Sequence, residues 1–139
     1  MSVPVHKRTP CKFEVVLKAK ELAKHTLNKC CNEKHFPPNY RDALTNDLIW
    51  TAKDIFANVY RANNVLVRKP ADLDRRRRLQ ESAADECNSL LMHVELAQAV
   101  FHLPLGSVAH WTDMILTERS MIRKWIESDA ERYKELANS

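Results

Sequence analysis

The chain has 139 residues, of which 45% are hydrophobic and 29% charged, with a formal net charge of +4. This length suits one domain, 1–139, with a single core, and no apolar run approaches the ~18 residues of a membrane span. Only one glycine is present, which leaves little material for β-hairpin turns or a phosphate-binding loop. The composition therefore predicts an all-α protein. Because the N-terminal stretch has no apolar run long enough for a signal peptide, we expect a cytoplasmic location.

The first helix is expected at residues 10–31. Thr9 can act as its N-cap, and Pro10 suits the first helical position, where a missing N–H costs nothing. Small and apolar residues then recur at helical steps, at Val16, Ala19, Ala23, Leu27 and Cys30. Further apolar residues flank this stripe on both sides, so the apolar arc exceeds the ~100° of an ordinary surface helix. The excess indicates either contact with another copy of the chain or a broad core with scattered exposed residues.

A second helix is expected at residues 40–64. Pro37 and Pro38 interrupt the helical pattern before it, and Asn39 can serve as its N-cap. Its apolar stripe consists of Leu44, Leu48, Ala52, Ile55, Val59 and Ala62. Ile49, Phe56 and Tyr60 widen that apolar side.

Two further helices are expected at residues 72–102 and 107–136, with Asp72 and Ser107 as their N-caps. The stripe of the third helix is Leu79, Ala83, Cys87, Leu90, Val94, Ala97 and Phe101. That of the fourth helix is Val108, Trp111, Ile115, Glu118, Ile122 and Trp125. Four amphipathic helices joined by short loops predict an up-down-up-down four-helix bundle.

Residues 75–78 are an unbroken row of arginines. Successive helical residues point in different directions, so the row cannot form a one-sided patch. Arg77 and Arg78 are expected to face solvent and Arg75 a flank, and acids four residues away can pair with the row. Arg76 points toward the core side, where it can extend past the core to water, pair with a carboxylate on another helix, or reach a partner.

Residue patterns of catalytic and metal sites are missing from the sequence. The cysteines, Cys11, Cys30, Cys31 and Cys87, form no C-x-x-C pair, and we expect buried free thiols. The six histidines share no ligand spacing, His102 and His110 are expected at the surface, and no Glu-x-x-His pair of a di-iron bundle occurs. No nucleophile, Walker or zinc-protease motif is present. We therefore expect no catalysis, no metal and no cofactor.

Positive charge is concentrated in the first half of the chain. Residues 1–70 carry 13 Lys/Arg against 6 Asp/Glu, and residues 71–139 carry 9 against 12. The candidate binding residues for an anionic partner are Lys12, Lys18, Lys20, Lys24, Lys34, Arg41, Arg75, Arg76, Arg77 and Arg78. The nucleic-acid partner expected for them is RNA or a single DNA strand, bound through phosphates and hence with little sequence preference and strong salt dependence. Lysines at this density are also common on an ordinary solvated helix face.

Three segments carry a family resemblance: KFEVVLKAKELAKHTL, HFPPNYRDALTNDLIWTAKDIFANVYRANN and RRRRLQESAADECNSLLMHVELA. They resemble the accessory variability determinants, small four-helix-bundle proteins encoded beside the reverse transcriptase of diversity-generating retroelements in prokaryotes and phages. Those proteins are in turn similar to bundles encoded in intervening sequences of bacterial ribosomal RNA genes. The resemblance covers roughly residues 12–126, and its motifs, such as F-P-x-x-Y-R, mark helix boundaries rather than active-site chemistry.

The resemblance implies a ring-like homopentamer whose basic surface binds the reverse transcriptase and its template RNA. Such an assembly supports mutagenic copying of a repeat into a variable gene, without catalysis of its own. The wide apolar arc of the first helix and the positive first half of the chain agree with this expectation. The alternative is a structural or regulatory oligomeric bundle with no nucleic-acid role.

Overall fold

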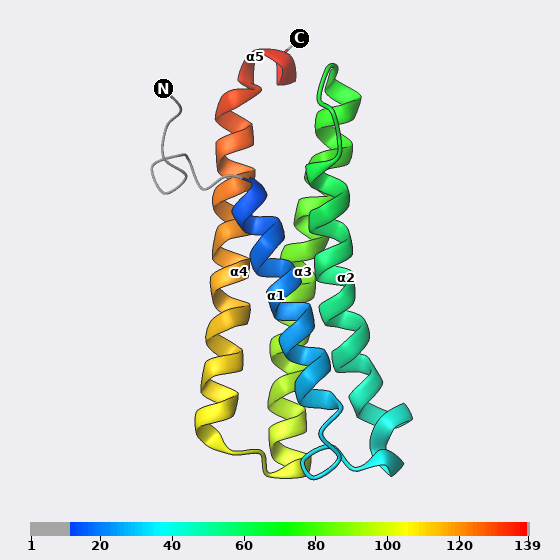
Figure 1. The fold of residues 1–139 in the computed structure, drawn as a ribbon. Coiled ribbons are helices and arrows are strands. Elements are labelled where there is room, and N and C mark those ends of the chain that lie inside the picture. Colours follow the sequence, from blue (N-terminus) through cyan, green and yellow to red (C-terminus); the bar gives the residue numbers. More distant parts are fainter. Residues whose placement is uncertain (1–11, 139) are drawn as a thin grey trace.

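A computed structural model describes residues 12–138, which form helices and loops and contain no strand. The four long helices are α1 (Lys12–Cys30), α2 (Asn46–Asn63), α3 (Pro70–Phe101) and α4 (Leu105–Arg132). Three short elements are the 3-10 turn Pro38–Tyr40, the π-helical turn Arg41–Thr45 and α5 (Lys134–Ala137). Consecutive long helices lie side by side and run in opposite directions (Figure 1). The prediction of an all-α chain with four long helices is confirmed.

Helix α1 packs against α2 and α4, and α3 packs against the same two helices. The helices α1 and α3 therefore occupy opposite corners of the bundle. With 19 residues against the 32 of α3 and the 28 of α4, α1 covers only part of the bundle's length. Figure 1 shows that it begins well below the end at which α4 terminates, so that end contains α2, α3 and α4.

The core follows the predicted stripes of α2, α3 and α4 closely, but the buried face of α1 is rotated from the predicted one. Val15, Leu22 and Thr26 are fully or almost fully buried, whereas Leu27, which the prediction placed inside, is 37% exposed. Apolar residues on both flanks allow either phase, and packing between α2 and α4 selects the Val15 flank. The indole N–H of Trp111 donates to the Thr26 hydroxyl at 3.0 Å, which holds α1 in this rotation.

The start of the second helical segment differs from the prediction. Instead of an α-helix from residue 40, the chain forms a 3-10 turn and a π-helical turn before α2 begins at Asn46. A π-helical turn contains an extra residue per turn and shifts the helical phase. Here it lets two successive residues, Leu44 and Thr45, both be buried. Tyr40 packs across the loop on Phe101, with ring centroids 5.3 Å apart.

Helix α3 begins at Pro70 rather than at residue 72. Proline is favoured in the first turn because its missing N–H needs no partner there. Asp72 therefore lies inside the first turn, and its carboxylate accepts the backbone N–H groups of Arg68 and Lys69 at 3.1 and 3.2 Å. Asp72 thus contributes to the cap, as predicted, but it does so from the third helical position, because the N-cap residue is Lys69, three residues earlier.

Helix α4 begins at Leu105, so Ser107 lies inside the helix rather than capping it, and its hydroxyl accepts a hydrogen bond from the Lys29 ammonium group. The predicted single helix to residue 136 is divided, because α4 ends at Arg132 and α5 follows. Thr9 and Pro10, the predicted start of the first helix, lie outside the described residues. Among residues 12–138, no helix combines the length and the apolar character needed to cross a membrane.

Candidate nucleic-acid interface

Two adjoining grooves lie on the surface, one between α1 and α2 and the other on α2 alone, and Lys53 and Phe56 line both. The first is also lined by Lys20, Ala23, Lys24, Leu27 and Asn28, and the second by Ala57, Tyr60 and Arg61. Trp50 adjoins them, because the Lys53 ammonium lies 4.4 Å from the centroid of its ring. We call these lining residues, together with Trp50, the α1–α2 face.

The α1–α2 face is positively charged without interruption. Lys20, Lys24, Lys53 and Arg61 line it, no lining residue is acidic, and none of these four cations forms an ion pair within the part of the chain that the structure describes. Lys20 and Lys24 lie on one side of α1 because residues four apart share a helix face. The two grooves therefore present four cations with no acid among their lining residues.

The nearest acidic residue of α2, Asp54, is directed toward α3 instead. There it interacts with Glu86, whose carboxyl oxygen accepts a hydrogen bond from the Asn58 amide at 2.6 Å. Burial, reinforced by the charge of Asp54, raises the pKa of Glu86 to about 7. Helix α2 thus separates a positive face beside α1 from an acidic pair beside α3.

Aromatic rings alternate with the cations on the α1–α2 face. Trp50 is 59% exposed and Tyr60 54% exposed, and the half-buried Phe56 contacts the Tyr60 ring edge-on at 6.0 Å. Large exposed aromatic side chains close together are typical of a surface that binds another molecule. A polyanion with flat, apolar bases matches both components of this face.

The predicted binding residues of the first half lie on different parts of the surface. Lys20 and Lys24 belong to the α1–α2 face, whereas Lys18 lies toward α4 and pairs with Glu21 at 3.5 Å. Lys34 is exposed in the loop after α1. Arg41 begins the π-helical turn and lies 3.9 Å from a carboxylate oxygen of Glu33. The side chain of Lys12 lies outside the described part of the structure.

The arginine row lies at the start of α3, at the end of the bundle opposite the loop that carries Lys34 (Figure 1). Arg75 and Arg78 are exposed, as predicted for a flank and a solvent position. Arg77, predicted to face solvent, is half-buried, and its Nε has no hydrogen-bond partner. The predicted pairs with acids four residues away do not form among the described residues, and Asp72 contacts backbone groups instead.

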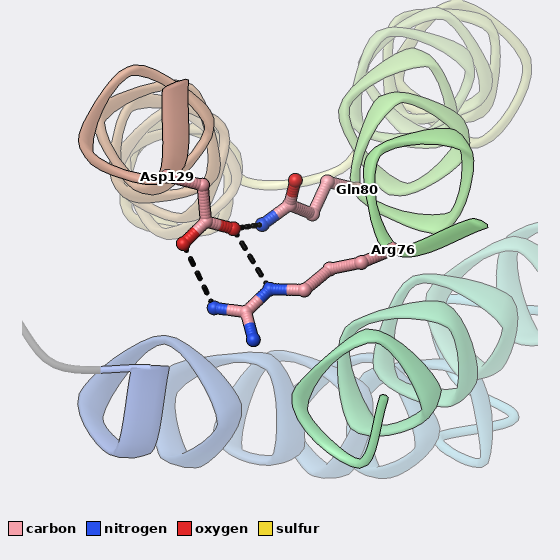
Figure 2. Close-up of polar contacts among 3 residues, drawn as sticks. All are labelled: Arg76, Gln80 and Asp129. Carbon is pink, nitrogen blue, oxygen red and sulfur yellow. Dashed lines mark hydrogen bonds and ion pairs between the residues drawn. The ribbon is translucent and has the colours of Figure 1, made fainter. Parts of the chain in front are cut away.

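Arg76 is 1% exposed and extends into the middle of the bundle (Figure 2). Its Nε and one terminal nitrogen donate to the two carboxylate oxygens of Asp129 on α4, at 2.7 and 2.8 Å. The Gln80 amide donates to the same carboxylate at 2.8 Å. The guanidinium also lies over the rings of Trp125 and Tyr133, at 5.1 and 5.8 Å from their centroids.

Of the alternatives open for Arg76, the structure shows pairing with a carboxylate on another helix. The prediction that Arg76 points toward the core is confirmed. Its inclusion among the binding residues was wrong, because a guanidinium enclosed by Asp129 and two aromatic rings is not presented to an external partner. Within the row, only Arg75 and Arg78 remain as exposed candidates.

A second ionisable group, Glu118 of α4, is buried without a partner. It is 1% exposed, and neither of its carboxyl oxygens has a hydrogen bond. Burial raises its pKa to about 9, although the Lys18 ammonium acts in the opposite direction. The Glu118 carboxyl is therefore protonated at neutral pH, which avoids the large cost of an isolated buried charge.

The three cysteines within residues 12–138 are free thiols. Burial raises the pKa of Cys30 and Cys87 to about 12, so both are inert thiols, whereas Cys31 is exposed, contrary to the prediction. Cys11 lies outside the described residues. Among residues 12–138, no group of three or more His, Cys, Asp or Glu side chains is placed to hold a metal ion. His102 and His110 are exposed, as predicted.

Sequence reasoning found only half of the cations on the α1–α2 face. Lys53 and Arg61 were missed, and so was the exposure of Trp50 and Tyr60. The available signal was their spacing, because positions 50, 53, 57, 60 and 61 follow one another along the side of α2 opposite its apolar stripe. Comparison with protein-family models, with curated proteins and with solved structures gives no match.

Proposed function

We propose that this chain is a non-catalytic accessory protein of a diversity-generating retroelement, acting in the cytoplasm. In this role it binds the reverse transcriptase and its template RNA and supports mutagenic cDNA synthesis and retrohoming. The observation that carries the proposal is the α1–α2 face, with four cations, exposed aromatic rings and no acid. The resemblance of the sequence to the accessory variability determinants supplies the reverse transcriptase as the protein partner.

A nucleic acid is favoured over a small anion by the extent of this face. Its cations come from two helices and flank two open grooves rather than converging on one point. Phosphates spaced along a strand can contact several such cations at once, and each contact releases a counterion. A single small anion would satisfy only one or two of them. The geometry thus supports a binding protein for a polyanion.

A ring-like homo-oligomer, the pentamer that the resemblance implies, is supported by two apolar patches. Phe13 and Leu17 on α1 are 68% and 41% exposed, and Met92 and Leu96 on α3 are 56% and 50% exposed. These helices occupy opposite corners of the up-down-up-down bundle that we propose as the protomer. Contacts between two different patches of neighbouring copies close into a ring when the rotation permits.

The first prediction concerns salt-dependent RNA binding. Reversing two charges, in Lys20→Glu with Lys24→Glu, should weaken binding of unrelated RNA sequences alike, because the contacts are to phosphates. The slope of log K against log salt should also become shallower, by an amount on the order of one to two phosphate contacts. Fluorescence anisotropy with two labelled RNAs across a salt series measures both effects.

The matched control is Arg123→Glu with Lys124→Glu, which removes the same charge from exposed positions of α4. If binding responds to net charge alone, both double variants will weaken it equally and the α1–α2 face has no special role. Wild-type binding that does not change with salt would contradict a phosphate-directed mechanism altogether.

The second prediction is an assembly larger than a dimer. Because Phe13 and Leu17 project from α1 without cover, Phe13→Glu with Leu17→Glu should shift the mass toward that of a 16.1 kDa monomer while the helix content is retained. Size exclusion coupled to light scattering gives the mass, and circular dichroism gives the helix content. A wild-type monomer at micromolar concentration would refute the ring, and a stable dimer would exclude the pentamer.

The alternative function is a structural or regulatory oligomer that binds no nucleic acid. It is favoured by the exposed apolar patches alone and needs no role for the cations. Two observations separate the functions: a reverse transcriptase gene with paired template and variable repeats beside the coding sequence, and co-purification of that transcriptase with this chain. Assembly without either RNA or transcriptase binding would support the alternative.

A further inference from the structure

We propose that the α1–α2 face takes an unpaired nucleic-acid strand, whose bases stack on Trp50 and Tyr60 while its phosphates contact Lys20, Lys24 and Lys53. This inference rests on the proposed function and narrows the ligand of the same face to single strands. RNA or a single DNA strand is the partner expected from the sequence, but the charge pattern by itself does not distinguish a single strand from a duplex. The distinction comes from the rings that the fold leaves exposed.

Trp50 and Tyr60 are separated by ten residues of one helix, which corresponds to about 15 Å along its axis. At the ~3.4 Å axial rise per nucleotide of a strand in a B-DNA duplex, that distance corresponds to at most about four nucleotides, and a more extended unpaired strand covers it with fewer. Both rings are more than half exposed. Ten residues also turn the helix by about 1000°, so the two rings leave α2 about 80° apart around its axis. Two bases of one short segment can therefore stack on both rings if the strand crosses α2 obliquely.

The cations are placed to contact the phosphates of the same segment. Lys53 lies between the two aromatic positions along α2, and its ammonium is 4.4 Å from the centroid of the Trp50 ring. Across the groove, Lys20 and Lys24 provide a second row of charge on α1. A strand that crosses the exposed side of α2 toward this groove thus meets the two rings and Lys53 on α2, and then the lysines of α1. Cations and stacking rings together are the combination used for sequence-tolerant binding of single strands.

A duplex matches this face less well. Its bases are stacked on one another and present only their edges in the grooves, so the Trp50 and Tyr60 rings find no base face. The lysines can still attract its phosphates, which gives salt-dependent but weaker binding. The aromatic rings therefore predict that unpaired strands bind more tightly than duplexes. The cations alone predict no such difference.

A second copy of the chain is a poorer occupant of the α1–α2 face. In a two-fold contact the same surface meets itself, so four cations of one copy would oppose four of the other with no carboxylate between them. Like charges brought together in an interface cost several kcal/mol. A two-fold contact through this face is therefore disfavoured. In the ring proposed above, the contacts between copies are assigned to the apolar patches of α1 and α3, which leaves the α1–α2 face to the strand.

Tryptophan fluorescence offers a direct test of stacking. Of the three tryptophans, Trp111 and Trp125 are 1% and 4% exposed, whereas Trp50 is 59% exposed. Quenching by oligouridine consequently reports on Trp50. We expect quenching by oligouridine to be greater than quenching by the same strand annealed to oligoadenosine, and to be lost in Trp50→Leu.

Affinity supplies the second readout. Trp50→Leu with Tyr60→Leu keeps apolar side chains of good helix propensity but removes the flat rings. It should lower the affinity for labelled oligouridine at least tenfold, because stacking of each base contributes about that factor or more. The affinity for the duplex and the slope against salt should not change. Tyr40→Leu, an exposed ring at the end of the bundle, is the control and should leave both affinities unchanged.

The outcomes separate the inference from the proposed function. Equal loss of single-strand and duplex binding in the leucine variant, or loss of neither, overturns stacking, while the charge-reversal result still tests phosphate binding. A lower oligomeric mass in the leucine variant assigns the rings to contacts between copies and also overturns the inference. If the wild-type chain binds neither strand nor duplex, both the inference and nucleic-acid binding fail.

Discussion

Replacing Glu118 by Gln is expected to flatten the dependence of stability on pH between about pH 7 and 9. In the folded chain the Glu118 carboxyl is buried without a hydrogen-bond partner, and burial raises its pKa from 4.5 to about 9. A carboxyl whose folded pKa is raised stabilises the fold fully below its unfolded pKa. That stability is then lost as the pH rises toward the folded pKa, because only the unfolded state readily releases the proton.

The wild-type chain should therefore lose stability across this window with a slope of up to about 1 kcal/mol per pH unit. Glutamine has the same shape and no titratable proton, so the slope should largely disappear. Urea unfolding followed by circular dichroism at a series of pH values measures it. Burial raises the pKa of the Cys30 and Cys87 thiols from 9.0 to about 12. Their own loss of stability therefore begins as the pH approaches 9, and it is the same in wild type and in Glu118→Gln, so the difference between the two curves reports on Glu118.

A matched control is available in Glu86, whose pKa is raised to about 7 by burial and by Asp54. The change Glu86→Gln should flatten the curve between about pH 4.5 and 7 and leave the slope above pH 7 intact. Parallel curves for wild type and Glu118→Gln between pH 7 and 9 would mean that Glu118 has a partner or reaches water in the folded chain. A gain of stability in Glu118→Leu above pH 5, of about 1 kcal/mol or more, would support the buried, unpartnered carboxyl.

The helices were predictable where one face alone is apolar. All six residues of the α2 stripe, from Leu44 to Ala62, are buried as predicted. On α1 the same reasoning gave the wrong centre, because apolar residues on both flanks allow two phases and only packing against α2 and α4 chooses between them. The π-helical turn before α2 was also beyond pattern reasoning, since it depends on burying Leu44 and Thr45 together.

Sequence reasoning reached only part of the functional surfaces, and for a similar reason. Lys20 and Lys24 were predicted from the charge of α1, but the α1–α2 face exists only once α2 places Lys53 and Trp50 beside them. A helical wheel gives directions around one axis. It does not say which residues of two helices share a groove.

The position of Arg76 illustrates the same limit. Its inward direction followed from the stripe of its own helix. The sequence also contained a signal for the partner of Arg76. Asp129 lies four residues after Trp125, in the core register of α4, and at the end of the bundle where α3 begins. Two opposite charges in core registers at the same end of antiparallel helices predict a buried pair.

That pair gives the largest expected loss of stability from a single substitution. Arg76→Ala leaves the Asp129 carboxylate buried with only the Gln80 amide as a hydrogen-bond donor, and Asp129→Ala leaves a guanidinium that cannot lose its proton. Each should destabilise the bundle by about 3 to 5 kcal/mol. Thermal and urea unfolding measure the loss. Arg78→Gln, at an exposed position of the same row, should stay within about 0.5 kcal/mol of wild type.

The double variant Arg76→Met with Asp129→Leu tests two explanations for the instability of the single variants. Either the ion pair itself is strongly stabilising, or each single alanine variant is unstable because it leaves one buried charge without a partner. Removing both charges also removes the cost of taking them out of water, so this variant should be much more stable than either single alanine variant and close to wild type. Arg76→Lys should not rescue stability, because an ammonium cannot make the two parallel bonds to Asp129 or lie flat over Trp125. Additive losses in the double variant would show that the two side chains act independently and that the buried pair does not join α3 to α4. Near-complete recovery would instead show that the pair supplies little net stability, because its attraction offsets the cost of taking both charges out of water.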